Sequence, residues 1–124
     1  MEDLDLTLFL GGTRSGKSAL AEALVTARAR GPVWYLATAR PLMDDPAMAE
    51  RIRRHRSRRP AHWHTLECPR HPGRELAPLL AAQAPDGPVP TVLLDCVTLW
   101  MSNILFALDD PQDAAAFEAS LREE

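Results

Sequence analysis

The sequence predicts an α/β protein in which a mostly parallel sheet is flanked by helices, and three observations support this fold class. An apolar run at Leu4–Leu10 is followed by two glycines and then by an Ala- and Leu-rich helical stretch. A second apolar run, Val33–Ala37, comes directly after that helix, and a third, Thr91–Asp95, has the same strand composition. Because a strand–helix–strand unit favours parallel pairing, these runs predict a parallel sheet. The length suits a single domain over residues 1–124.

The boundaries of the first two helices follow from residues that start and stop helices. The first helix begins at Lys17 and ends at Gly31 and the proline after it. Asp45 followed by Pro46 supplies an N-cap and a proline at the first helical position. The helix that they open runs through AMAERIRRHRSRR and is predicted to end before Pro60.

The other segments carry weaker signals. AHWHTLE, residues 61–67, has the composition of a short strand, and RELAPLLAAQA, residues 74–84, predicts a helix interrupted by a proline. CVTLWMSNILFAL, residues 96–108, is apolar and predicts a helix. A last helix is predicted to open at Asp109 or Asp110.

Composition limits the class of partner. The formal net charge of -3 argues against a general nucleic-acid or membrane-surface binder, because such partners select for basic surfaces. The N-terminal stretch is acidic where a signal peptide would be basic, and no apolar run is long enough to span a bilayer. Cys68 and Cys96 form no paired motif. We therefore expect a cytoplasmic protein with no membrane span and no nucleic-acid partner.

A glycine-rich loop follows the first apolar run and matches GxxxxGK[ST], with a predicted strand before it and a helix after it. In this P-loop pattern the backbone folds around a phosphate chain, and the helix N-terminus adds partial positive charge. Lys17, the only lysine of the chain, would reach the β- and γ-phosphates of ATP or GTP. The alternative is a turn that merely joins a strand to a helix. The predicted phosphate-binding residues are Gly11, Gly12, Thr13, Arg14, Ser15, Gly16, Lys17 and Ser18.

Two oxygen-bearing side chains are candidates for a magnesium site. The hydroxyl of Ser18 stands where the P-loop pattern supplies a Mg²⁺ ligand. Asp95 closes the apolar strand TVLLD, and a carboxylate in that position orients Mg²⁺ or its waters in P-loop proteins. The other interpretation of Asp95 is a simple helix cap.

The segment RIRRHRSRR, residues 51–59, places six arginines around His55. Three interpretations remain open. In the first, the arginines form a solvated helix face whose charge Glu50 partly offsets at Arg54. In the second, they form a surface that binds RNA or DNA phosphates. In the third, they neutralise a triphosphate while His55 acts on it.

His55 itself has a structural and a catalytic interpretation. Met48, Ile52 and His55 share one helical face, which is typical of a packed structural histidine. The surrounding cations instead disfavour the imidazolium, and the neutral imidazole is the nucleophilic form. Attack on the α-phosphate of a nucleotide would give a covalent nucleotidyl-histidine and release pyrophosphate.

Taken together, GGTRSGKS, YLATA, MAERIRRHRSRRPAHWHTLE and VLLDCVTLWMSNILF resemble the bifunctional adenosylcobinamide kinase/adenosylcobinamide-phosphate guanylyltransferase family of cobalamin biosynthesis. The resemblance spans nearly all of the chain. It implies two reactions. ATP or GTP phosphorylates the aminopropanol hydroxyl of adenosylcobinamide at the P-loop, and GMP then passes from GTP through a guanylyl-histidine to give adenosylcobinamide-GDP. It also implies a homotrimer.

The resemblance assigns roles to particular residues of this chain. It makes His55 the guanylylated residue and Lys17 the residue of phosphoryl transfer. Arg54 occupies a place where some relatives have a second histidine, which leaves His55 as the nucleophile of the motif. The further positions that resemble nucleotide contacts of the family are Thr38, Ala39, Arg56, Ser57, Arg58, Arg59, Glu67 and Asp95.

Members of the family continue beyond the end of this sequence with further strands and a motif of the TNEVG type. We therefore expect a C-terminally truncated sheet with an exposed apolar edge, incomplete relative to the family. Two other functions stay open. One is a P-loop kinase of another small metabolite, in which His55 is only structural. The other is a phosphate- or RNA-binding module that uses the arginine-rich helix.

Two further signals have plain explanations. His62, His64, Cys68 and His71 are four potential zinc ligands within ten residues, but their spacing is not that of known zinc sites, and we expect no structural metal there. Trp63 is expected in the core, with stacking on a nucleotide base as the alternative.

Overall fold

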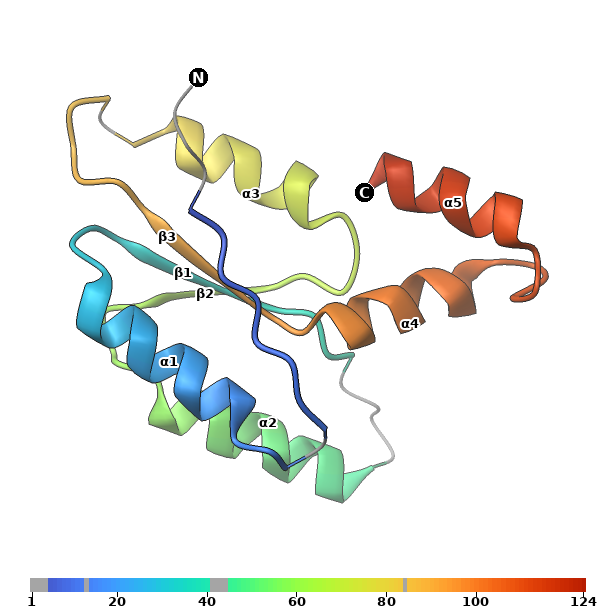
Figure 1. Ribbon diagram of the computed structural model, residues 1–124, viewed down its shortest axis with the longest axis horizontal. Coiled ribbons are helices and arrows are strands. Elements are labelled where there is room, and N and C mark those ends of the chain that lie inside the picture. The colour runs from blue at the N-terminus through green and yellow to red at the C-terminus, as the bar shows by residue number, and fades with distance from the viewer. Residues whose placement is uncertain (1–4, 13, 41–44, 84) are drawn as a thin grey trace.

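The computed structural model describes residues 5–12, 14–40, 45–83 and 85–124, and within these ranges the chain forms three parallel strands and five helices (Figure 1). The fold class is therefore the predicted α/β arrangement of the P-loop type. The elements in chain order are Lys17–Arg28 (α1), Val33–Ala37 (β1), Pro46–Arg58 (α2), His64–Glu67 (β2), Pro72–Ala81 (α3), Thr91–Asp95 (β3), Val97–Ala107 (α4) and Ala114–Glu123 (α5).

The sheet has the strand order β2-β1-β3, with both neighbours parallel to the central strand β1. In this register Ala37, the last residue of β1, lies opposite Glu67 on one side and Asp95 on the other. All three strands thus end at one edge. In open α/β sheets this carboxyl edge is where ligands bind.

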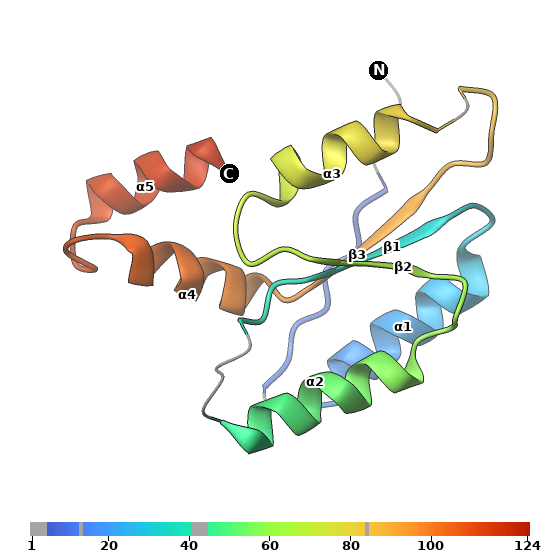
Figure 2. The ribbon, with the colours of Figure 1, turned by 180° about the vertical axis from the view of Figure 1, so that it is seen from behind.

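Helices cover both faces of the sheet. α1 and α2 lie on one face and α3 on the other, while α4 and α5 extend beyond the carboxyl edge (Figures 1 and 2). A buried cluster of Val25, Val33, Tyr35 and Trp63 forms the core between α1 and the sheet. No helix within the described ranges is long and apolar enough to cross a membrane.

Several predicted boundaries are confirmed. β1 and β3 have the predicted ends, and α2 begins at Pro46 with Asp45 as its N-cap. The Asp45 carboxylate accepts hydrogen bonds from the backbone N–H groups of Ala47 and Met48 at 3.1 and 3.2 Å. The short strand after residue 61 and the proline-containing helix after it are also present, as β2 and α3.

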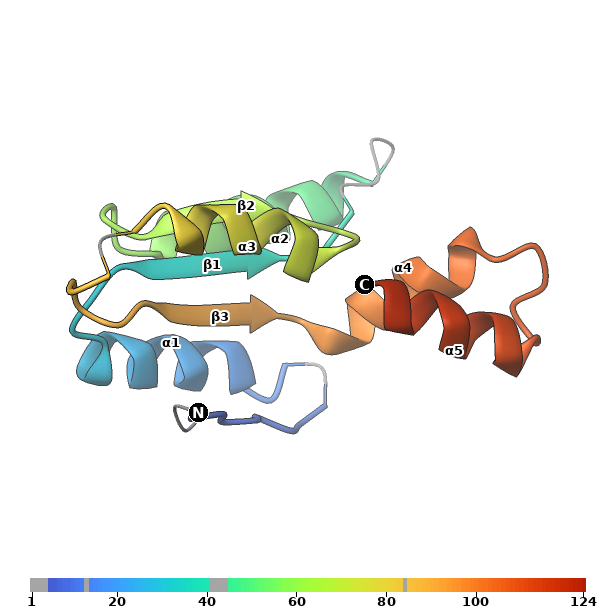
Figure 3. The same cartoon turned by 90° about the horizontal axis from the view of Figure 1, so that it is seen from above.

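The strand predicted at Leu4–Leu10 is wrong over residues 5–10, and Leu4 lies outside the described residues. Leu6, Leu8 and Leu10 are 80, 67 and 85% exposed. The segment runs along the margin of the molecule in Figure 3, and in Figure 1 it crosses in front of the strands toward the start of α1. It forms no strand beside β3. Alternating apolar residues predict a strand only where a neighbouring strand supplies hydrogen-bond partners and a face to cover them.

The last helix begins later than predicted. Asp113 is the N-cap of α5, and its carboxylate accepts a hydrogen bond from Ala116 N–H at 3.0 Å. Asp110 instead accepts from Gln112 N–H at 3.0 Å through its side chain and from Asp113 N–H at 3.1 Å through its carbonyl. Residues 110–113 therefore form a turn, which delays the helix by one turn of chain.

Candidate functional site

The glycine-rich loop leads directly into α1. Gly16 is the N-cap of α1 and has a φ of 84°, a left-handed conformation that favours glycine. A Cβ added to Gly11 would lie 2.5 Å from Ser15 Oγ, so the loop is closed tightly there. Among the described residues no side chain caps the start of α1, which leaves its N–H groups available for an anion. Lys17 Nζ curls back and donates to Gly12 O at 3.3 Å.

Asp95 faces the same loop from the end of β3. Its Oδ2 accepts hydrogen bonds from Ser18 Oγ at 3.2 Å and from Tyr35 Oη at 2.6 Å. A hydroxyl beside a carboxylate is a set of hard oxygen donors, and that chemistry fits Mg²⁺. The predicted magnesium pair is therefore brought together. Within the described ranges no cluster of three or more His, Cys, Asp or Glu side chains could hold a metal ion.

The arginine-rich helix α2 forms the opposite wall. None of its residues is buried, and Met48, Ile52 and His55 form a half-buried face. This face lines a cavity, so His55 is not packed in the core as the structural interpretation would require.

The P-loop and α2 line one cavity of about 1110 Å³, with the carboxyl ends of β1 and β3 between them. Of the predicted site residues, Thr13 lies outside the described residues, and Thr38 does not line this cavity. The cavity wall includes the remaining predicted residues, which are Gly11, Gly12, Arg14, Ser15, Gly16, Lys17, Ser18, Ala39, His55, Arg56, Ser57, Arg58, Arg59, Glu67 and Asp95.

The cavity is strongly cationic. Among the described residues that line it, seven side chains are Arg or Lys and two are carboxylates, Glu67 and Asp95. Arg56 is ion-paired with Glu67, and the predicted pair of Glu50 with Arg54 is present at 3.2 Å. A concave site with this surplus of cations attracts polyanions such as nucleoside triphosphates.

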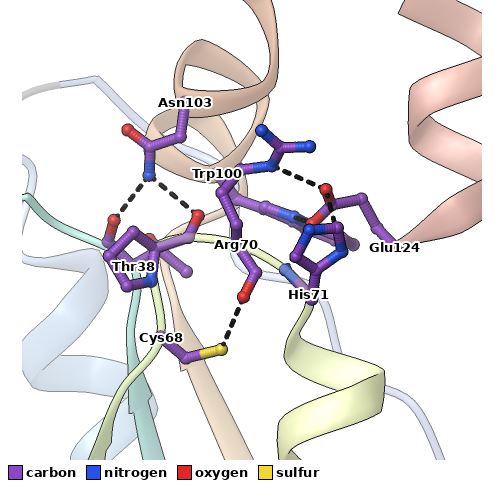
Figure 4. A network of polar contacts seen from close by, with 8 residues as sticks. Thr38, Cys68, Arg70, His71, Trp100, Asn103 and Glu124 are labelled. Atoms are coloured by element: carbon purple, nitrogen blue, oxygen red, sulfur yellow. Dashed lines mark hydrogen bonds and ion pairs between the residues drawn. The ribbon is translucent and has the colours of Figure 1, made fainter. Parts of the chain in front are cut away.

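Thr38, which the resemblance suggests as a nucleotide contact, does not line the cavity. It is fully buried, and its hydroxyl donates to Cys96 O and accepts from Cys96 N–H, both at 2.8 Å. Asn103 of α4 then donates through Nδ2 to Thr38 O at 2.8 Å and to Pro69 O at 3.0 Å (Figure 4). These contacts tie together the segments that follow the three strands.

Sequence reasoning missed Tyr35 and Asn103, both of which carry polar groups in buried surroundings. In the sequence Tyr35 lies within an apolar run and at the start of the motif YLATA, and Asn103 lies within an apolar helical segment, and neither pattern indicates a polar contact. An amide in an otherwise apolar helix was a usable signal, because a buried polar group needs a hydrogen-bond partner.

Glu124 forms a second buried polar centre, away from the cavity. Its side chain is 1% exposed and accepts hydrogen bonds from Arg70 Nε at 2.6 Å, His71 N–H at 2.5 Å and Trp100 Nε1 at 2.9 Å (Figure 4). Burial alone would raise the pKa of Glu124, but these donors and the Arg70 charge outweigh it and lower the pKa below its ordinary value. The network fastens α5 and α4 to the start of α3.

His64, His71 and Trp63 each contact other residues of the fold. His64 stacks on Trp34 with ring centroids 4.4 Å apart, and His71 Nδ1 lies 3.4 Å from Glu124 Oε1. Trp63 is buried in the core beside Val33, so it is not placed to stack on a base. The core interpretation of Trp63 is confirmed.

A parallel sheet, a glycine-rich loop entering a helix and a cationic cavity at the carboxyl edge define an α/β nucleotide-binding protein of the P-loop class. Residues 7–123 match the family described as cobinamide kinase/cobinamide phosphate guanyltransferase. The chain belongs to this family, as the resemblance predicted.

Characterised relatives support the assignment. The chain is 50% identical over 105 residues to the bifunctional adenosylcobalamin biosynthesis protein CobP of Pseudomonas aeruginosa, covering 85% of this chain and 55% of that protein. It is 44% identical over 125 residues to CobU of Salmonella typhimurium, covering 96% and 63%, and 42% identical over 108 residues to CobU of Escherichia coli, covering 87% and 54%. The chain therefore spans only part of the length of these relatives.

Proposed function

We propose that this chain carries out both reactions named in its family's description. It phosphorylates adenosylcobinamide with ATP or GTP at the P-loop, and it transfers GMP from GTP to adenosylcobinamide phosphate through a guanylyl-histidine at His55. The observation that carries the proposal is the shared cavity of about 1110 Å³, which the P-loop and His55 both line. Its size suits a nucleotide together with part of a second substrate.

In the phosphoryl transfer, the chain binds and orients the triphosphate for in-line attack by the substrate hydroxyl. Lys17 and the N-terminus of α1 hold the β- and γ-phosphates. The substrate hydroxyl oxygen attacks the γ-phosphorus, its proton passes to solvent, and the bond to the β-phosphate oxygen breaks with its electron pair on the departing nucleoside diphosphate. Held by Ser18 and Asp95, Mg²⁺ would neutralise charge on those phosphates.

In the nucleotidyl transfer, His55 is the nucleophile. A neutral imidazole nitrogen attacks the α-phosphorus of GTP, and the bond to the β-phosphate breaks to release pyrophosphate. The arginines of α2 line the cavity and stabilise the charge that develops on the phosphate oxygens. A phosphate oxygen of adenosylcobinamide phosphate then attacks the guanylyl group, and the P–N bond breaks to regenerate the imidazole.

The intact mass of the protein after incubation with GTP and Mg²⁺ tests the nucleotidyl step. We expect a GMP-sized increase that maps to the peptide containing His55 and disappears in His55→Asn. The matched control is His62→Asn, because His62 is exposed and does not line the cavity. An adduct of equal yield in His55→Asn would remove His55 from the proposal.

Nucleotide binding, phosphate transfer and the salt dependence of binding distinguish this function from the two alternatives. A kinase of another metabolite would bind nucleotide and transfer phosphate without any GMP adduct. An RNA-binding module would bind with a steep salt dependence and would survive Lys17→Ala, because counterion release would supply its affinity. Arg28→Ala is the matched control for Lys17→Ala, since Arg28 lies exposed in the last turn of the same helix. The proposal includes a cytoplasmic homotrimer, and sedimentation velocity would measure the subunit number.

A further inference from the structure

A buried phenol connects the two walls of the cavity. Tyr35 lies in the middle of β1, the central strand, and is 1% exposed. Its hydroxyl donates a hydrogen bond of 2.6 Å to Asp95 Oδ2 on the side of the P-loop. Its ring lies under the guanidinium of Arg59, whose Cζ is 3.5 Å from the ring centroid. Arg59 is the C-cap of α2, the helix that carries His55.

The hydroxyl of Tyr35 fixes the carboxylate of Asp95. Ser18 Oγ donates to the same oxygen, Oδ2, at 3.2 Å, so the bond from Tyr35 is the shorter of the two. A hydrogen bond from a neutral donor to a carboxylate is stronger than one between neutral groups. Burial, and after it the bond to Asp95, raises the pKa of Tyr35 well above its ordinary value.

The ring of Tyr35 supports Arg59. The guanidinium lies within the distance at which a cation is attracted to an aromatic face. Arg59 Nη1 also donates to Thr65 Oγ1 on β2 at 3.2 Å, while Arg59 Nε is buried without a hydrogen-bond partner among the described residues. The ring face and one hydroxyl thus hold a guanidinium that lines the cavity.

We propose that Tyr35 is a positioning residue of the nucleotide site. Its hydroxyl orients Asp95, and through it Ser18, while its ring holds Arg59 at the end of the His55 helix. Tyr35 takes part in no bond-making step. The inference rests on the proposed function in that the cavity must bind a nucleotide.

The test measures the dissociation constant of GTP twice for each variant, once in excess EDTA and once in saturating Mg²⁺. Tyr35→Phe removes only the hydroxyl and keeps the ring. We expect its metal-free affinity to stay within about twofold of the wild type, while the gain in affinity on adding Mg²⁺ falls about tenfold. Arg59→Met removes the cation from the ring face together with its hydrogen bond to Thr65 Oγ1. We expect its metal-free affinity to fall about fivefold and its Mg²⁺-dependent gain to stay unchanged.

A merely structural tyrosine would give a different result. Tyr35→Phe would then lower the thermal unfolding midpoint and leave both dissociation constants unchanged, which overturns the inference and leaves the proposed function standing. If Tyr35→Phe does not fold, Arg59→Met decides, because unchanged metal-free affinity in that variant also overturns the inference. A wild-type chain that binds no GTP in either condition overturns the proposed function and this inference together.

Discussion

Replacing Asn103 with aspartate should destabilise the protein more than replacing it with alanine, although aspartate has nearly the same shape. Asn103 is 8% exposed, and its Nδ2 donates to the carbonyl oxygens of Thr38 and Pro69 at 2.8 and 3.0 Å (Figure 4). These carbonyls belong to the segments that follow β1 and β2. Alanine removes the donor, whereas aspartate places an oxygen where the two carbonyls need a proton.

The magnitude follows from these two bonds. Each buried hydrogen bond contributes about 1 kcal/mol net, and a carbonyl left without a donor adds a penalty of about 1 kcal/mol or more. Because two bonds are lost and two carbonyls are left without this donor, we expect Asn103→Ala to lower the free energy of unfolding by about 4 kcal/mol. In a domain of this size that corresponds to a fall in the unfolding midpoint of roughly 15 °C. For Asn103→Asp we expect about 5 kcal/mol, because an ionised carboxylate buried against two carbonyl oxygens has no hydrogen to donate to either.

Urea unfolding followed by tryptophan fluorescence measures both values. The matched control is Phe106→Ala in the same helix, since Phe106 is 84% exposed and its loss should change stability by less than about 0.5 kcal/mol. Stability of Asn103→Asp equal to the wild type would refute the reasoning, because it would mean that the two carbonyls do not depend on the amide.

Three further predictions concern other parts of the chain. Iodoacetamide should alkylate Cys96 of the native protein before Cys68, because burial raises the pKa of the Cys68 thiol. GTP should slow only the alkylation of Cys96, because Cys96 lines the cavity; peptide mapping measures both rates. The contribution of Glu124 to the free energy of unfolding should be complete above its ordinary pKa of 4.5 and be lost as the pH falls through its lower pKa in the folded protein. The urea midpoint of Glu124→Gln should therefore vary less with pH below 4.5 than that of the wild type. Asp45→Ala should lower stability by about 1 kcal/mol through loss of the α2 cap, and an unchanged thermal midpoint would contradict this.

Elements with local signals were predictable from the sequence. The start of α2 depends on two adjacent residues, an aspartate that accepts from the first N–H groups and a proline that lacks one. β1 is a short apolar run that follows Gly31 and a proline, and β3 is one that follows Pro90 and closes with Asp95; their predicted ends are those of the structure. The P-loop was recognisable for the same reason, because its spacing is contained in eight consecutive residues.

Features that depend on pairing between distant segments were not predictable. The segment 5–10 has the pattern of a strand, but β1 pairs with β2 and β3, and the segment joins neither β3 nor any other described strand. The partners of Tyr35 and Thr38 depend on the register between β1 and β3, which brings residues 60 and 58 positions away into contact. No local pattern specifies that register.

The parallel topology explains how one sheet can position both walls of a single cavity. Because β2 and β3 flank β1 and end level with Ala37, Glu67 and Asp95 stand on either side of it, roughly 10 Å apart at the usual strand spacing. Asp95 accepts from Ser18 and so holds the P-loop wall, while Glu67 is ion-paired with Arg56 and so holds the α2 wall. Each carboxylate therefore contacts one wall. Tyr35, two residues before Ala37 on β1, contacts Asp95 directly and the end of α2 through Arg59. Loss of either carboxylate should loosen its own wall first, whereas loss of the tyrosine side chain should loosen both.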